Sequence, residues 1–180
     1  MRVLFSEAAI RARVAELADE LGIAYKGRRP LLLCTLTGAF IFTADLARAL
    51  QPLCPDLEVD FVRASSYGAG TSAGELTLSG TGKIPLAGRH VLIVEDIVDT
   101  GATAAALRAA CTSSTSAAAG AASVAVVALL DKKCARARAP PGLDPDYAAF
   151  ECPDAFVVGY GLDAGEADRG WPFVGVRESE

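Results

Sequence analysis

The chain has 180 residues, of which 17 are basic and 22 acidic, so its formal net charge at pH 7 is −5. This length, with 52% hydrophobic residues, fits one globular domain with a sizeable core. The acidic balance argues against sequence-independent binding of nucleic acid, because there is no basic excess to neutralise a phosphate backbone.

Membrane insertion and disulfide formation are also not expected. The longest unbroken aliphatic run covers residues 124–130, whereas a membrane-spanning helix needs roughly 20 apolar residues. No signal-peptide pattern follows Arg2, so we expect a cytoplasmic protein. The 5 cysteines are widely spaced without a C-x-x-C pair, which predicts reduced and mostly buried thiols.

The first part of the chain predicts a helix, a strand with a second helix, and another strand. An apolar stripe with helical spacing begins after Ser6, and Gly22 is expected to end this helix. Residues 31–36 form an aliphatic run of buried-strand length, and a helix is predicted over 40–50. The alternating residues 57–61 predict a half-exposed strand, and the stretch 65–74, rich in Gly, Ser and Thr, predicts a mobile loop.

The second part repeats the order of strand, turn and helix. We predict a strand over 91–94, a turn over 95–103, a helix over 104–110, a surface connection over 111–123, and strands over 124–130, 156–160 and 173–176. Aliphatic strands that alternate with helices predict an α/β fold, a parallel twisted sheet flanked by helices. No internal repeat or domain boundary is visible, so residues 1–180 are predicted to form a single domain. Ligands of such sheets bind beyond the carboxyl ends of the strands.

One strand end carries the most informative motif. Aliphatic residues 91–94 are followed by Glu95 and Asp96, and then by Asp99-Thr100-Gly101-Ala102-Thr103, which opens a helix. Backbone N–H groups and threonine hydroxyls at such a turn can hold one phosphate group. The neighbouring carboxylates are explained if the ligand is a sugar phosphate, whose hydroxyls, or a magnesium ion over them, contact the acids. The alternative is a solvated acidic turn without a ligand.

The motif over 91–103 resembles the 5-phosphoribosyl 1-diphosphate signature of the hypoxanthine-guanine type of purine phosphoribosyltransferases. Further blocks resemble the family's diphosphate loop (36–40), the Ser-Tyr pair of its lid (64–68), its base-reading lysine (129–132), its purine-stacking segment (150–163) and its C-terminal closure (169–176). The resemblance implies the type I phosphoribosyltransferase fold. This fold has a Rossmann-like core, about residues 31–150, and a small hood over the active site formed by the N-terminal and C-terminal segments.

The resemblance implies a purine salvage transferase. It would convert 5-phosphoribosyl 1-diphosphate and a 6-oxopurine base, which is hypoxanthine, guanine or possibly xanthine, to the nucleoside monophosphate, such as IMP or GMP, and diphosphate. Mg²⁺ is the implied cofactor, and a homodimer or homotetramer is the implied assembly. No nucleic acid or membrane partner is expected.

The resemblance also implies a role for individual residues in the sugar and diphosphate sites. Glu95 and Asp96 would contact the ribose hydroxyls and the magnesium ion, and Asp163 would be a second magnesium contact. The 5-phosphate would lie against Ile97 and the turn Thr100, Gly101, Ala102 and Thr103. The diphosphate would lie against Leu36, Thr37, Gly38 and Arg169.

The remaining implied roles concern the base and the chemical step. Asp99 would be the general base at the purine N7. Lys132 would donate to the 6-oxo group, Phe156 would stack on the purine, and the backbone of Val157 would pair with the base edge. Ser66 and Tyr67 would close over the bound substrates and shield them from water.

Each assignment has a plainer alternative. Asp99 could cap a helix, Lys132 and Lys133 could solvate a strand end, Phe156 could belong to the core, and Asp163 with Arg169 could form a surface salt bridge. The lid could be a flexible hairpin. The chain also departs from the family at two positions, since Thr37 replaces a frequent lysine and Asp168 replaces a common aromatic residue.

Some stretches of the sequence match motifs of other functions. Residues 70–74 spell the G-x-S-x-G pattern of serine hydrolases, but a strand is predicted after them and the only histidine, His90, is not in triad order. Residues 68–73 mimic a dinucleotide fingerprint without the helix it requires. A regulatory protein that binds RNA would need a basic face. If the protein is a phosphoribosyltransferase, specificity for pyrimidines or for adenine is the nearest alternative to specificity for 6-oxopurines.

Overall fold

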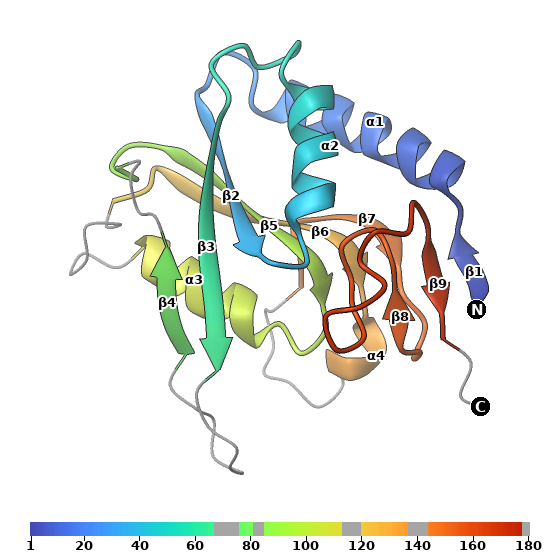
Figure 1. The fold of residues 1–180 in the computed structure, drawn as a ribbon. Coiled ribbons are helices and arrows are strands. Elements are labelled where there is room, and N and C mark those ends of the chain that lie inside the picture. The colour runs from blue at the N-terminus through green and yellow to red at the C-terminus, as the bar shows by residue number, and fades with distance from the viewer. Residues whose placement is uncertain (67–75, 81–84, 113–119, 137–143, 178–180) are drawn as a thin grey trace.

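The computed structural model describes residues 1–66, 76–80, 85–112, 120–136 and 144–177 (Figure 1). These residues form a six-stranded sheet with helices on both faces and a second, three-stranded sheet beside it. The predicted site residue Tyr67 lies outside the described residues, as does most of the predicted loop over 65–74.

The main sheet has the strand order β4-β3-β2-β5-β6-β7. Its strands are β2 (Pro30–Leu36), β3 (Glu58–Ser66), β4 (Leu76–Gly80), β5 (His90–Val98), β6 (Ser123–Asp131) and β7 (Tyr147–Glu151). All neighbouring pairs are parallel except β3 with β4. The predicted α/β fold with a parallel sheet is therefore confirmed, with one antiparallel strand at its edge.

Helices cover the sheet from two sides. α1 (Glu7–Ala24) and α2 (Phe40–Leu50) lie on one face and α3 (Ala102–Thr112) on the other, while the short α4 (Lys133–Arg136) follows β6 (Figure 1). In β5, Leu92 and Val94 belong to the core cluster with α1 and α2, whereas Val91 and Ile93 belong to the cluster with α3. An uninterrupted aliphatic run is needed here because both faces of the strand are buried.

The small sheet brings the two ends of the chain together. Its order is β1 (Arg2–Phe5), β9 (Val174–Val176) and β8 (Val157–Val158), and Arg2 pairs with Val176. Both neighbouring pairs are antiparallel. The strand predicted over 156–160 is present only as Val157–Val158, and it pairs with β9 in this small sheet rather than with the main parallel sheet.

The first helix begins as expected and ends later than expected. Ser6 caps it, since its Oγ accepts a hydrogen bond from the N–H of Ala9 at 3.3 Å. Gly22 does not end the helix but lies inside it, where a Cβ atom would be 2.7 Å from the Leu53 side chain. Gly22 is thus explained by the close contact of α1 with the turn after α2 rather than by a C-terminal cap.

Several local expectations need correction. Residues 95–98, predicted as a turn, continue β5, because Ile97 and Val98 still pair with β6. The half-exposed strand β3 is present, but Val59 and Phe61 are 37% and 40% exposed whereas Asp60 is 6% exposed. Alternation defines two faces of a strand but not which face is covered. β1, β7 and α4 were not predicted.

In the described part of the chain, no helix has the length and apolar character needed to span a membrane. The 5 cysteines are free, and all but Cys134 are buried, as expected.

Candidate active site

The motif residues gather at the carboxyl end of β5. A hollow of about 80 Å³ lies between this strand end and the start of α3, lined by residues 95 and 97–104. Gly101 has a positive φ of 77°, and its carbonyl accepts the first helical hydrogen bond, from Ala105, at 2.9 Å. The N–H groups that begin α3 are therefore directed toward this turn, which is the arrangement that binds anions at helix starts.

Glu95 is a buried carboxylate that lines the hollow. Its side chain is 5% exposed, and Oε2 accepts a hydrogen bond from Oγ1 of Thr35 at 2.8 Å. Burial raises the pKa of Glu95 to about 8; the Thr35 hydrogen bond opposes this shift and the charge of Asp96 adds to it. Oε1 of Glu95 has no hydrogen-bond partner among the described residues. One oxygen of Glu95 is thus held by Thr35, and the other is buried without a partner among the described residues.

Asp96 lies against the loop that follows β2. Its Oδ1 accepts a hydrogen bond from the N–H of Ile97 at 2.9 Å. Burial raises the pKa of Asp96, while backbone N–H groups and the charge of Arg169 act in the opposite direction. A Cβ atom on Gly38 would lie 1.6 Å from Oδ2 of Asp96, so only glycine fits at this point of the loop. The peptide bond that precedes the exposed Thr37 is cis.

A turn after β8 packs on the other side of the same loop. Gly161 has a φ of 105°, and a Cβ atom there would be 2.0 Å from the carbonyl oxygen of Gly38. The carbonyl of Gly161 in turn accepts a hydrogen bond from Nη1 of Arg169 at 2.8 Å. Figure 1 shows this turn, in dark red, beside the carboxyl end of β2. Residues far apart in the sequence therefore meet at the carboxyl ends of the central strands β2 and β5.

Asp163 and Arg169 form an ion pair of 3.0 Å in this turn. The Arg169 side chain is only 18% exposed and also contacts Glu166 at 3.0 Å, so the pair is largely shielded. Asp168 does not compete for Arg169. Its carboxylate instead accepts a hydrogen bond from Nε1 of Trp171 at 3.1 Å and lies 3.5 Å from Arg177.

The two adjacent lysines have different surroundings. Nζ of Lys132 lies 3.3 Å from Asp154 and donates to the carbonyl of Ala155 at 3.4 Å. Burial lowers the pKa of Lys132, but the hydrogen bond with Asp154 and the charges of Asp99 and Asp154 outweigh it, so the net pKa is raised. Nζ of Lys133 pairs instead with Glu151 at 2.8 Å. Lys132 is thus directed toward the segment that precedes β8, whereas Lys133 pairs with the last residue of β7.

Phe156 and Val157 follow that segment. Phe156 is 62% exposed, so the alternative in which it belongs to the core is wrong, whereas Val157 is 6% exposed. An exposed aromatic ring next to a lysine leaves a surface on which a planar base could stack.

Asp99 is exposed at the turn, and no hydrogen bond to its carboxylate is found among the described residues. It does not cap α3, because Gly101 takes that place. Its charge acts on Lys132, so the two groups face a common region. Of the predicted lid pair, Ser66 ends β3, and Tyr67 is not described.

The only histidine of the sequence does not lie in this site. His90 begins β5, at the opposite end of the strand from Glu95, and its Nδ1 is 2.7 Å from Oγ of Ser123. Residues 68–74, which carry the hydrolase and dinucleotide patterns, lie outside the described residues, but β4 confirms a strand after them.

The described residues contain no cluster of three or more His, Cys, Asp or Glu side chains that could hold a metal ion alone. Magnesium commonly binds one or two carboxylates together with substrate oxygens and water. The free Oε1 of buried Glu95 and the carboxylates of Asp96 and Asp163 fit such a substrate-completed site.

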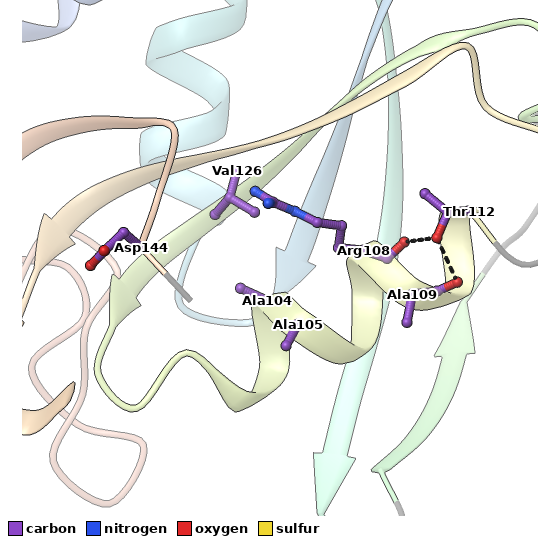
Figure 2. A pocket seen from close by; sticks show the side chains of 7 residues that line it. All are labelled: Ala104, Ala105, Arg108, Ala109, Thr112, Val126 and Asp144. Atoms are coloured by element: carbon purple, nitrogen blue, oxygen red, sulfur yellow. Dashed lines mark hydrogen bonds between the residues drawn. The ribbon is translucent and has the colours of Figure 1, made fainter. Parts of the chain in front are cut away.

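A second hollow, of about 330 Å³, lies on the neighbouring face of α3 (Figure 2). Ala104 lines both hollows. The larger one is lined by small side chains of α3, by Val126 and Thr112, and by Arg108 and Asp144. Its arginine pairs with Asp146 at 2.5 Å. The larger hollow thus lacks Glu95 and the turn that begins α3, which make the smaller one suited to a sugar phosphate.

Comparison with known proteins agrees with this geometry. Residues 4–164 match the model of the phosphoribosyl transferase domain. The hypoxanthine-guanine phosphoribosyltransferase of Bacillus subtilis is 40% identical over 176 residues, which are 97% of this chain and 92% of that protein. The chain belongs to the hypoxanthine-guanine phosphoribosyltransferases. Thus the predicted family is confirmed.

Further relatives extend this picture of a phosphoribosyltransferase. A structure of Trypanosoma cruzi hypoxanthine phosphoribosyl transferase superimposes with a TM-score of 0.87 at 38% identity, over 99% of this chain and 91% of that one. The bifunctional protein TilS/HprT of Listeria innocua is 39% identical over 99% of this chain. The chain spans only 26% of the length of that bifunctional relative.

Four residues contact the site residues of this phosphoribosyltransferase but were not predicted as site residues: Thr35, Gly161, Glu166 and Asp154. Thr35 had a signal in the sequence, since it is a polar residue within an aliphatic strand. Asp154 and Gly161 lie in the block that resembles the purine-stacking segment, but their contacts, like that of Glu166, depend on how separate turns pack.

Proposed function

We propose that this protein transfers a 5-phosphoribosyl group from 5-phosphoribosyl 1-diphosphate to a 6-oxopurine base, with hypoxanthine and guanine as the principal substrates. The observation that carries the proposal is the hollow at the start of α3, which is lined on one side by helix N–H groups and on the other by Glu95. A phosphorylated ribose matches both, because its phosphate is an anion and its hydroxyls are hydrogen-bond donors.

In the proposed complex the 5-phosphate lies in the turn formed by Thr100, Gly101, Ala102 and Thr103, next to Ile97. The ribose hydroxyls donate to Glu95 and Asp96. The free Oε1 of Glu95 supports this placement, since a buried carboxylate oxygen without a partner is costly. The ligand would supply the missing partner.

The leaving diphosphate lies between the loop with Leu36, Thr37 and Gly38 and the guanidinium of Arg169. Backbone N–H groups carry the loop's share of this binding, because Thr37 offers a hydroxyl and no positive charge. Arg169 offers a fork of donors. Mg²⁺ bound to the substrate oxygens, Asp163 and the neighbouring acids would neutralise charge on the diphosphate as it leaves.

The chemical step forms a bond from the purine N9 to C1 of the ribose while the bond from C1 to the diphosphate oxygen breaks, and the diphosphate keeps that electron pair. Asp99 accepts the proton from the purine N7. Its exposed carboxylate, which holds no hydrogen bond with the described residues, is available for this. A transition state that resembles a ribosyl cation is stabilised by the nearby carboxylates.

The base lies on Phe156, with its edge against the backbone of Val157 and its 6-oxo group toward Nζ of Lys132. A 6-aminopurine would place a donor against the lysine ammonium and leave both unpaired, so adenine should be rejected. The contacts of Lys132 with the carboxylate of Asp154 and the carbonyl of Ala155 support this choice over Lys133.

The lid and the hood remain predictions of the same proposal. Ser66 and Tyr67 would cover the reacting centre and exclude water. The small sheet of β1, β9 and β8 would be the hood, since Val157 belongs to it. We keep one domain over residues 1–180, a homodimer or homotetramer, and a cytoplasmic location as predictions.

The direct test is to incubate the protein with 5-phosphoribosyl 1-diphosphate and one free base at a time, with and without Mg²⁺. We expect IMP from hypoxanthine, GMP from guanine, no AMP from adenine, and loss of turnover when a chelator removes the metal. Formation of AMP or a pyrimidine nucleotide in preference to IMP and GMP would overturn the assignment of the base.

A further inference from the structure

A buried hydroxyl lies directly behind the sugar-facing carboxylate. Thr35 is the penultimate residue of β2 and is 5% exposed. Its Oγ1 lies 2.8 Å from Oε2 of Glu95 and 2.8 Å from the carbonyl oxygen of Val94. Both partners are on β5, although they are separated from Thr35 by 59 and 60 positions in the sequence.

The register of the sheet explains this contact. Cys34 of β2 pairs with Val94 of β5 in the parallel ladder, so the next residues of the two strands, Thr35 and Glu95, lie side by side at the strand ends. A buried hydroxyl is costly unless it is hydrogen-bonded. Threonine is therefore tolerated within the aliphatic strand because two acceptors are within its reach.

Because of this contact, the two oxygens of Glu95 have different surroundings. Oε2 is held by Thr35, whereas Oε1 has no partner among the described residues and Glu95 lines the hollow. With Oε2 fixed, the carboxylate has one orientation. Without that contact, a side chain with several rotatable bonds would have to be ordered by the ligand, which weakens binding.

We propose that Thr35 is a positioning residue for the phosphoribosyl substrate, which acts through Glu95 by holding its carboxylate toward the sugar hydroxyls. This inference rests on the proposed function, because it assumes that the hollow takes a phosphorylated ribose. It predicts that Thr35 affects the binding of the sugar substrate and leaves the binding of the purine unchanged.

The test compares Thr35→Val, which keeps the shape but removes the hydroxyl, with Thr35→Ser, which keeps the hydroxyl. Thr43→Val is the matched control, because Thr43 of α2 is also buried and its hydroxyl donates to the carbonyl of Ala39, just before the helix, at 2.8 Å. For each protein, calorimetry gives the Kd of 5-phosphoribosyl 1-diphosphate with Mg²⁺, and initial rates give kcat and both KM values.

We expect Thr35→Val to raise the Kd and KM for 5-phosphoribosyl 1-diphosphate by about tenfold, the effect of losing one hydrogen bond to a carboxylate. The KM for hypoxanthine should stay unchanged, and Thr35→Ser and Thr43→Val should bind like the wild type. If Thr35→Val does not fold, Thr35→Cys replaces it, since a thiol is a much weaker donor.

A double-mutant cycle with Glu95→Ala tests whether Thr35 acts through Glu95. Once the carboxylate is gone, Thr35→Val should weaken binding no further. Wild-type affinity in the valine variant, or an equal loss with and without Glu95, would overturn the inference. These outcomes differ from failure of the proposed function, in which the wild-type protein itself would not bind or turn over the substrate.

Discussion

Gly38 and Asp96 are packed so closely that a Cβ atom on Gly38 would lie 1.6 Å from Oδ2 of Asp96. Gly161 closes the other side, since a Cβ atom on it would lie 2.0 Å from the carbonyl oxygen of Gly38. The loop proposed to bind diphosphate is therefore held between the acidic strand end and the turn before Asp163. A change at this point displaces several proposed ligand contacts at once.

Replacement of Gly38 by alanine should lower kcat/KM for 5-phosphoribosyl 1-diphosphate by about a hundredfold, because the loop or Asp96 must shift by an ångström or more. Steady-state kinetics at saturating hypoxanthine measures this. Gly170→Ala is the matched control, since no atom lies within 4 Å of the position of its Cβ. Equal activity of the two variants would show that the close packing has no role in the reaction.

Replacement of Asp99 by asparagine or alanine should reduce kcat by about a hundredfold or more, because the purine N7 loses its proton acceptor. Binding of 5-phosphoribosyl 1-diphosphate, measured by calorimetry, should stay nearly unchanged. The double variant of Glu95 and Asp96 to alanine should show the opposite pattern, with weakened binding of the sugar substrate. Wild-type turnover of the Asp99 variants would make the general-base assignment wrong.

Lys132 and Lys133 provide an internal comparison for the base site. Lys132→Ala should raise the KM for hypoxanthine and guanine by about tenfold, because the 6-oxo group loses a charged donor. Lys133→Ala should not, because Lys133 pairs with the exposed Glu151. Initial rates with each base at saturating sugar substrate separate the two. A larger effect at Lys133 would transfer the assignment to that residue.

Stability should depend on pH through Glu95. Burial raises its pKa from 4.5 to about 8 in the folded protein, so between these values the folded state holds a proton that the unfolded state has released. The contribution of the protonated Glu95 to the free energy of unfolding is therefore complete below pH 4.5 and is lost as the pH rises through 8. Each pH unit in this window changes the free energy of unfolding by about 1.4 kcal/mol at most.

The Glu95→Gln variant has no such proton to lose. Urea unfolding of both proteins across this pH window, without magnesium or substrate, should show the wild type losing stability relative to the variant as the pH rises. Parallel curves for the two proteins would mean that Glu95 is ionised at neutral pH in the unliganded protein.

Local patterns of the sequence determined the elements that depend on neighbours along the chain. The apolar stripe after Ser6, the bounds of α2 and the aliphatic residues before Glu95 were all visible, because helix and strand periodicity is a property of short windows. The turn proposed to bind phosphate was visible for the same reason, since its acids, glycine and threonines lie close together in the sequence. The resemblance that rests on this turn led to the family that the comparisons confirm.

Contacts between distant residues were decided only by the tertiary structure. The register of β2 against β5 places Thr35 behind Glu95, and the packing of two turns brings Gly161 onto Gly38. The choice of Lys132 over Lys133 depends on where the segment before β8 lies. No pattern in a short window encodes these distances, because they depend on how separate elements pair and pack.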